Sequence, residues 1–220
     1  MKICISTCKG YSESTIPNLL NSLKQASFNI NDVVIVEGNN EKTESTTFHN
    51  AMLWKVEHNS FDITALLGIC ELGLKSDKWL LLHDTCAVGN TFTENVYRYI
   101  NLMGDTNCLP LKYFPSMSIG IYKHDYIIDN YNILLKYKSF TKTHDDIKSA
   151  KYKAFDSEDC LLWRATQPEM VISTIKNETT PDKKIWNFNY SPGRIQEYFP
   201  ELDLYKLKAN YCGGMINTEL

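Results

Sequence analysis

The stretch at residues 79–85, WLLLHDT, is an apolar run that ends in a carboxylate, Asp84. An apolar run of this length suits a strand that is buried on both faces of an α/β sheet, and the carboxyl end of such a strand opens into the crevice where these sheets bind ligands. A carboxylate in that crevice is well placed to bind a metal ion or to face a phosphorylated substrate. The simpler alternative is that Asp84 only caps a turn, so the rest of the chain has to decide between the two.

Two other acidic positions also lie at the end of a predicted strand or at the start of a predicted helix. Glu37 follows a second apolar run, and Glu158 with Asp159 precedes a third. The ends of parallel strands, and the helices that begin after them, gather at one edge of an α/β sheet. With Thr7 and Lys9 from the loop after the first strand, these carboxylates predict a polar rim around one site.

The elements that would position these residues alternate between strand and helix. The order strand, helix, strand between Lys2 and Val36 predicts a right-handed parallel crossover. Further strands are expected at Met52–Glu57, Trp79–Cys86, Leu109–Pro115 and Met117–Tyr122, helices near Ser14, Asp62, Thr91, His124 and Ser157, and polar loops at 41–47 and 141–154. The chain has neither an internal repeat nor a linker, so we expect one α/β domain over residues 1–220, with a mostly parallel central sheet flanked by helices.

The composition excludes several classes of protein. Hydrophobic residues make up 43% of the 220 residues, which is enough for a sizeable core, and the net charge of -3 gives no electrostatic reason to expect nucleic acid. No segment approaches the ~20 apolar residues of a membrane helix, and the start turns polar too soon for a signal peptide. We therefore expect a cytoplasmic protein without a transmembrane segment, with peripheral membrane contact left open. The seven cysteines form no CxxC, which indicates reduced thiols without a zinc site or a disulfide frame.

The usual nucleotide-binding loops are absent from the sequence. Neither GxGxxG after the first strand nor GxxxxGK[ST] occurs. A nucleotide that is held without those loops needs other help. A divalent cation that bridges a carboxylate and a diphosphate is the usual physical solution.

The order of the motifs resembles the GT-A fold of nucleotide-sugar glycosyltransferases, in particular the large inverting family and its relatives in bacterial polysaccharide loci and large algal viruses. The similar segments are ISTCKGY, VIVEGN, NSFDITALLGICELG, WLLLHDT and SEDCLLWR, which together extend over nearly the whole chain. The resemblance implies a nucleotide-binding half at about residues 1–105 and an acceptor-binding half at about residues 106–220.

The resemblance also implies roles for residues of the first half. Thr7, Cys8 and Tyr11 would line the nucleobase pocket, mostly through backbone groups, with Tyr11 able to stack on the base. Glu37 would hydrogen-bond the base or the ribose, and Asp62 would lie near the base or the donor sugar. The simpler interpretations are a solvated turn acid for Glu37 and a helix N-cap for Asp62.

Asp84 would bind Mn²⁺ or Mg²⁺ together with the diphosphate, because hard cations prefer oxygen ligands. In this chain HDT replaces the DxD motif of the family, so His83 stands at the first acidic position and Thr85 at the last. His83 could ligate Mn²⁺, hydrogen-bond ribose or phosphate, or be an ordinary structural histidine. Metal dependence is therefore left open, and Asp84 is the one metal ligand that we assign.

The second half of the chain supplies the candidate catalytic residues. Asp159 would take the proton from the acceptor hydroxyl in an inverting transfer, and Glu158 would contact the acceptor or hold the loop. The simpler interpretation is that both residues favour a helix N-terminus through its dipole. Arg194 in a late loop would neutralise the diphosphate, and His144 is a second metal candidate.

These assignments predict an enzyme, a glycosyltransferase of the hexosyltransferase type. It would move a sugar from a nucleotide-diphosphate donor, with UDP favoured, to a hydroxyl of a glycan, lipid or protein acceptor. One alternative is a catalytically silent glycosyltransferase-like binding domain, which the HDT motif favours. Another is a sugar-phosphate nucleotidyltransferase, for which the loop TCKGY is too short and too poor in glycine.

Overall fold

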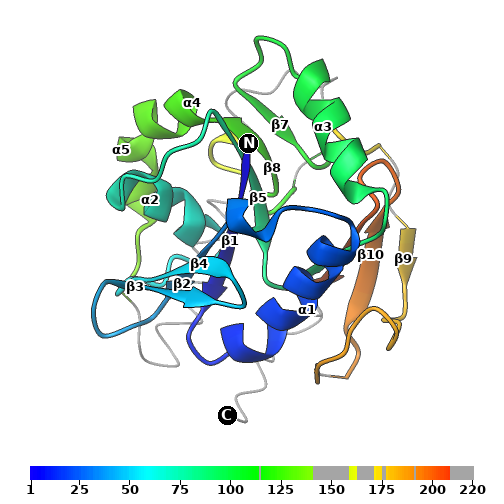
Figure 1. Ribbon diagram of the computed structural model, residues 1–220. Coiled ribbons are helices and arrows are strands. Elements are labelled where there is room, and N and C mark those ends of the chain that lie inside the picture. Colours follow the sequence, from blue (N-terminus) through cyan, green and yellow to red (C-terminus); the bar gives the residue numbers. More distant parts are fainter. Residues whose placement is uncertain (114, 141–158, 163–170, 175–176, 191, 209–220) are drawn as a thin grey trace.

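The computed structural model describes residues 1–113, 115–140, 159–162, 171–174, 177–190 and 192–208. Its centre is a seven-stranded sheet with the order β3-β4-β2-β1-β5-β8-β7 (Figure 1). The strands are β1 (Lys2–Cys8), β2 (Val33–Gly38), β3 (Glu44–Phe48), β4 (Ala51–Lys55), β5 (Lys78–His83), β7 (Cys108–Pro110) and β8 (Gly120–Lys123). The central strands β4, β2, β1 and β5 run parallel, and the outer strands add antiparallel pairs. The predicted parallel crossover from β1 to β2 is confirmed.

Helices cover both faces of this sheet, which confirms the predicted α/β class. They are α1 (Ser12–Gln25), α2 (Thr64–Glu71), α3 (Phe92–Leu102), α4 (His124–Asp129) and α5 (Tyr131–Leu134), with the 3-10 turns η1 (Ile30–Asp32), η2 (Phe61–Ile63) and η3 (Leu135–Tyr137). Side chains of β1 alternate between the faces: Ile3 and Ile5 pack in one core with Leu19 of α1, and Cys4 packs in the other with Leu66 of α2. Helices α4 and α5 lie beside α2 (Figure 1). Within the described ranges, no helix is long and apolar enough to cross a bilayer.

A smaller sheet begins where the central strand β5 ends. Its order is β6-β11-β10-β9, and all of its pairs are antiparallel. Its strands are β6 (Cys86–Val88), β9 (Asn177–Thr179), β10 (Ile195–Phe199) and β11 (Leu204–Lys208). Only Asp84 and Thr85 stand between β5 and β6, so the chain passes from one sheet to the other at the predicted carboxylate.

A buried histidine, His58, lies in the segment between β4 and α2. Its side chain is 2% exposed, its Nδ1 lies 2.9 Å from the Ser60 hydroxyl, and its Nε2 lies 3.7 Å from a carboxylate oxygen of Glu71. Burial lowers the pKa of His58 to about 4, although the charge of Glu71 opposes this shift. The imidazole is therefore neutral at pH 7.

Helix α2 approaches the sheet closely at Gly68. A Cβ atom at this position would lie 2.8 Å from Cγ1 of Val36 on β2. Val36 is fully buried, and its β-branched side chain has little freedom to move aside. The distance between α2 and β2 therefore depends on a glycine at this position.

The two strands expected between residues 109 and 122 are shorter than predicted, with β7 and β8 covering only their outer parts. Met117 and Ser118 between them have positive φ angles of 57° and 58°. Strand backbone does not adopt such angles, so the chain turns here instead of continuing the sheet.

Three further local predictions are wrong. The loop expected at 41–47 contains most of β3, an exposed edge strand that pairs with β4. Helix α1 begins at Ser12, and the Ser14 hydroxyl donates to the Tyr11 carbonyl instead of capping the helix. Thr91 does not form the expected capping box either, because its hydroxyl donates to Asp203 at 2.9 Å. The expected loop 141–154 and the start of the helix expected from Ser157 lie outside the described residues.

Candidate functional site

Asp84 lies where the parallel strands end, and two threonine hydroxyls bind it. Its Oδ2 accepts a hydrogen bond from Thr7 Oγ1 at 2.7 Å and another from Thr15 Oγ1 at 3.0 Å. Thr7 comes from β1 and Thr15 from α1, so the end of β5 is tied to both elements. The carboxylate is half-buried, and its position is therefore fixed while part of it stays open to a ligand.

Arg194 brings a positive charge to this carboxylate. It precedes β10 and is half-buried. Burial lowers the pKa of its guanidinium, and the nearby groups Tyr11 and Asp84 act in the opposite direction. An arginine stays protonated in such a setting. Three predicted ligand-binding residues, far apart in the sequence, therefore lie within electrostatic reach of one another.

Cys8 and Glu37 continue the site along the edge of the sheet. Burial, followed by the charges of Asp84 and Glu37, raises the pKa of the Cys8 thiol to about 12. Such a thiol stays neutral at pH 7 and is not a nucleophile. Glu37 is 6% exposed and accepts a hydrogen bond from the hydroxyl of Ser12, so it is not the solvated turn acid of the simpler interpretation.

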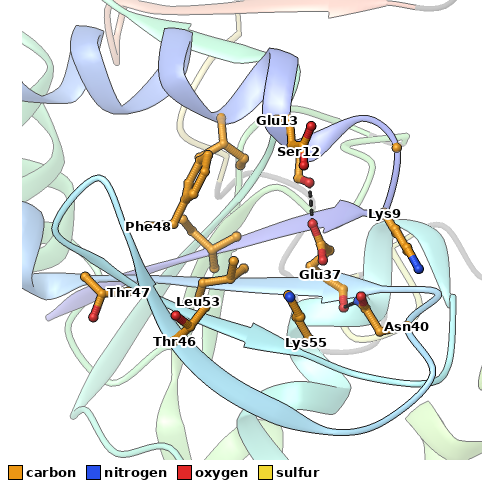
Figure 2. Close-up of a pocket in the computed structure, with 13 residues that line it drawn as sticks. Lys9, Ser12, Glu13, Glu37, Asn40, Thr46, Thr47, Phe48, Leu53 and Lys55 are labelled. Carbon is orange, nitrogen blue, oxygen red and sulfur yellow. Dashed lines mark hydrogen bonds between the residues drawn. The ribbon is translucent and has the colours of Figure 1, made fainter.

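A pocket of about 350 Å³ opens beside Glu37 (Figure 2). The loop after β1, the first turn of α1, the end of β2 and the β3–β4 hairpin enclose it. Its lining is apolar at Ile35 and Leu53 and charged at Lys9 and Lys55. Figure 2 shows the Glu37 carboxylate directed toward the start of α1. The pocket therefore combines an apolar wall with charged groups, and β1 lies between the strand that carries Glu37 and the strand that ends at Asp84.

His83 and Asp62 come together on the next part of the edge. His83 is 5% exposed, and its Nδ1 lies 3.7 Å from Asp62 Oδ1. Burial, and after it the positive charge of Lys206, lowers the pKa of His83 to about 3, while Asp84 and the backbone of Met117 oppose the shift. The imidazole is neutral at pH 7. Its buried Nε2 has no hydrogen-bond partner in the part of the chain that the structure describes.

Lys206 lies beside the HDT motif, which the sequence did not indicate. It lies on β11, is 5% exposed, and donates a hydrogen bond from Nζ to the hydroxyl of Thr85. The N–H of Leu207 donates to the Thr85 carbonyl at 2.8 Å, so β11 is bound to the turn that carries Asp84. The segment LYKLK has no pattern that marks one lysine as buried, and only the pairing of β11 with β6 places Lys206 beside the HDT motif.

Asp159, the predicted base, anchors a turn. It is 3% exposed, and its carboxylate accepts hydrogen bonds from the N–H and the hydroxyl of Ser116 and, at 2.9 Å, from the N–H of Ser118. These bonds hold the turn that includes Met117, whose backbone lies against His83. The turn thus connects Asp159 to the site, and its role as a base stays a prediction.

The described residues around Asp84 do not form a cation site by themselves. Over the ranges that the structure describes, no three His, Cys, Asp or Glu side chains are grouped so that they could hold a metal ion. The predicted Mn²⁺ or Mg²⁺ at Asp84 stays a prediction. Glu158 and His144, the other candidates of the second half, lie outside the described residues.

The chain overlaps in part with solved structures of S. aureus TarS, residues 1–349. The complex with UDP-GlcNAc has 15% sequence identity and a TM-score of 0.43, over 59% of this chain and 47% of that chain. The complex with UDP has 18% identity and a TM-score of 0.42, over 59% of this chain and 49% of that chain. This chain thus spans less than half the length of both structures. No protein-family model and no curated protein matches the chain.

Proposed function

We propose that this chain is a nucleotide-sugar glycosyltransferase with a GT-A-like fold, which transfers a sugar from a UDP-sugar to a hydroxyl group. The observation that carries the proposal is the meeting of Thr7, Glu37 and Asp84 at the ends of three adjacent parallel strands, beside a pocket. The carboxyl edge of parallel strands is where α/β sheets bind nucleotides. Residues 1–105 would bind the donor, and later segments would bind the acceptor.

The pocket beside Glu37 is the proposed place of the nucleobase. Its volume of about 350 Å³ lies within the range of small-molecule sites. Ile35 and Leu53 offer apolar contact to a planar ring, and the buried Glu37 carboxylate offers an acceptor to an N–H of the base or to a ribose hydroxyl. Tyr11 at the start of α1 is 42% exposed and has room to stack.

The diphosphate would then extend from this pocket toward Asp84 and Arg194. In the transfer, the acceptor oxygen bonds to the anomeric carbon, the bond from that carbon to the β-phosphate oxygen breaks, and the acceptor proton passes to a base. Negative charge gathers on the departing UDP, and the Arg194 guanidinium is within electrostatic reach of this place. Asp84 would face the ribose and the diphosphate, either directly or through Mn²⁺ or Mg²⁺.

A second candidate function is a binding domain without turnover, and the contacts of Asp159 favour it. The Asp159 carboxylate is buried and already accepts hydrogen bonds from Ser116 and Ser118. A general base has to reach the acceptor hydroxyl. Another group, such as Glu158, would have to act as the base if the chain is an enzyme.

Calorimetry with UDP, GDP, dTDP and uridine tests the proposal. UDP should bind, and Glu37→Gln should weaken UDP and uridine alike by about tenfold, since both place a base beside Glu37. Asp129→Asn, an exposed position at the end of α4, is the matched control and should change neither affinity. If no nucleotide binds, the proposal is wrong. If UDP binds but no UDP-sugar is hydrolysed or transferred, the chain is a binding domain.

A further inference from the structure

Lys206 is a buried cation for which the described residues supply only a neutral partner. The residue is 5% exposed, and its Nζ donates to the Thr85 hydroxyl. Within the described ranges, no carboxylate forms an ion pair with Lys206. A buried charge is costly unless it is paired, and an ammonium group has three N–H donors, of which Thr85 takes one.

The neighbouring lysine on the same strand shows the contrast. Lys208 lies 3.3 Å from a carboxylate oxygen of Glu197 and 4.0 Å from one of Glu178. Glu197, which stands opposite Lys206 in the register of β10 and β11, pairs with Lys112 at 3.1 Å and with Lys208. The carboxylates of the smaller sheet are therefore engaged with other lysines, and the Lys206 ammonium is directed at the HDT motif.

A second group in the same place also lacks a partner. His83 Nε2 is buried and forms no hydrogen bond within the described parts of the chain. His83 stands one residue before Asp84, and Lys206 is close enough to act on it electrostatically. Because Nδ1 faces the Asp62 carboxylate, the neutral ring carries its proton on Nδ1 and presents Nε2 as an acceptor. Nε2 therefore does not bind an anion, and the unpaired Lys206 cation is the group that an anion would fit.

We propose that Lys206 binds the diphosphate of the donor and supplies the positive charge that a divalent cation would bring to Asp84. This inference rests on the proposed function. Lys206 contacts Thr85, and Arg194 acts electrostatically on Asp84, so both cations are near the two residues that join β5 to β6. Two fixed cations there would stabilise the charge of the departing UDP, so donor binding would not require a metal.

Calorimetry with UDP and uridine, in EDTA and in Mn²⁺, tests this inference on the wild-type chain. We expect UDP to bind with the same affinity within about twofold in both conditions, and more tightly than uridine. If UDP affinity falls about tenfold or more in EDTA, a metal supplies the charge and the inference is wrong. This measurement needs no variant and does not depend on how a substitution affects folding.

The variants Lys206→Met and Lys206→Arg then test whether the UDP affinity depends on the charge of Lys206. Lys206→Met should weaken UDP about tenfold or more and leave uridine unchanged, because uridine has no phosphate, and Lys206→Arg should keep most of the UDP affinity. Lys208→Met on the same strand is the matched control and should not change UDP affinity. Equal UDP affinity in Lys206→Met and wild type would overturn the inference while the proposed function stands. Failure of the wild type to bind either UDP or uridine would overturn both.

Discussion

Replacing Thr7 by valine removes one of the two hydroxyls that hold Asp84 and keeps the shape of the side chain. Thr7 is 7% exposed, and its hydroxyl lies 2.7 Å from Asp84 Oδ2. A hydrogen bond to a charged group contributes about 1.5–3 kcal/mol to stability. Asp84 is half-buried, and Thr15 still binds the same oxygen at 3.0 Å. We therefore expect Thr7→Val to lower the free energy of unfolding by an amount at the lower end, about 1.5 kcal/mol.

Urea unfolding followed by tryptophan fluorescence measures this loss, and a double-mutant cycle assigns it to the contact. In the Asp84→Ala background, Thr7→Val has no carboxylate left to lose, so the coupling energy should be about 1.5 kcal/mol. Thr43→Val, at an exposed position, is the matched control, with an expected change within about 0.5 kcal/mol. A coupling energy below about 0.5 kcal/mol would refute the reasoning, because Asp84 would then be positioned by something other than Thr7.

Three further predictions concern other parts of the fold. Asp159→Asn should lower the free energy of unfolding by about 3 kcal/mol, since an amide replaces the acceptor of several donors; thermal unfolding measures this, and a fully stable variant without transfer activity would instead support the base role. In the folded chain, burial lowers the pKa of His58 to about 4 and that of His83 to about 3. In the unfolded chain, both histidines take up a proton below about pH 6.5. Stability should therefore fall between about pH 6.5 and 4, and His58→Asn should reduce that slope in urea titrations; an unchanged slope would contradict the neutral, buried histidine. Gly68→Ala should destabilise the chain by about 1–2 kcal/mol despite the helix propensity of alanine, and Val36→Ala in the same chain should recover part of the loss measured in urea.

The sequence predicted those features that local patterns determine. The apolar runs that become β1, β2 and β5 end in polar residues, and the crossover rule then brings Thr7, Glu37 and Asp84 to one edge. No pattern in these segments indicates the threonine hydroxyls as partners of Asp84. Thr15 reaches Asp84 only because α1 packs against β6, the strand that follows Asp84 and Thr85, and this packing is a property of the tertiary structure.

The residues that the sequence did not indicate depend on long-range pairing. Lys206 comes to lie beside the HDT motif through the register of β11 against β6, and this register joins segments whose sequences show no common period. Strand β3 has a polar, exposed pattern because it is an edge strand, so its segment resembles a loop. Asp159 stands in an acidic pair of the kind expected at a catalytic position, yet its carboxylate binds a turn. That turn is formed by Met117 and Ser118, whose φ angles are positive, and the sequence does not indicate it.

The short passage from β5 to β6 has a consequence for how the chain folds and opens. The contact between Thr7 and Asp84 spans 77 residues of sequence, whereas the contact between Thr85 and Lys206 spans 121. Closing a longer loop costs more conformational entropy, although the difference grows only slowly with length. Contacts of β11 should thus form later and open more readily than those of β1, and amide hydrogen exchange would report the order. A nucleotide that contacts both Asp84 and Lys206 would hold the end of β5 and strand β11 together. Its binding should therefore slow amide hydrogen exchange along β11.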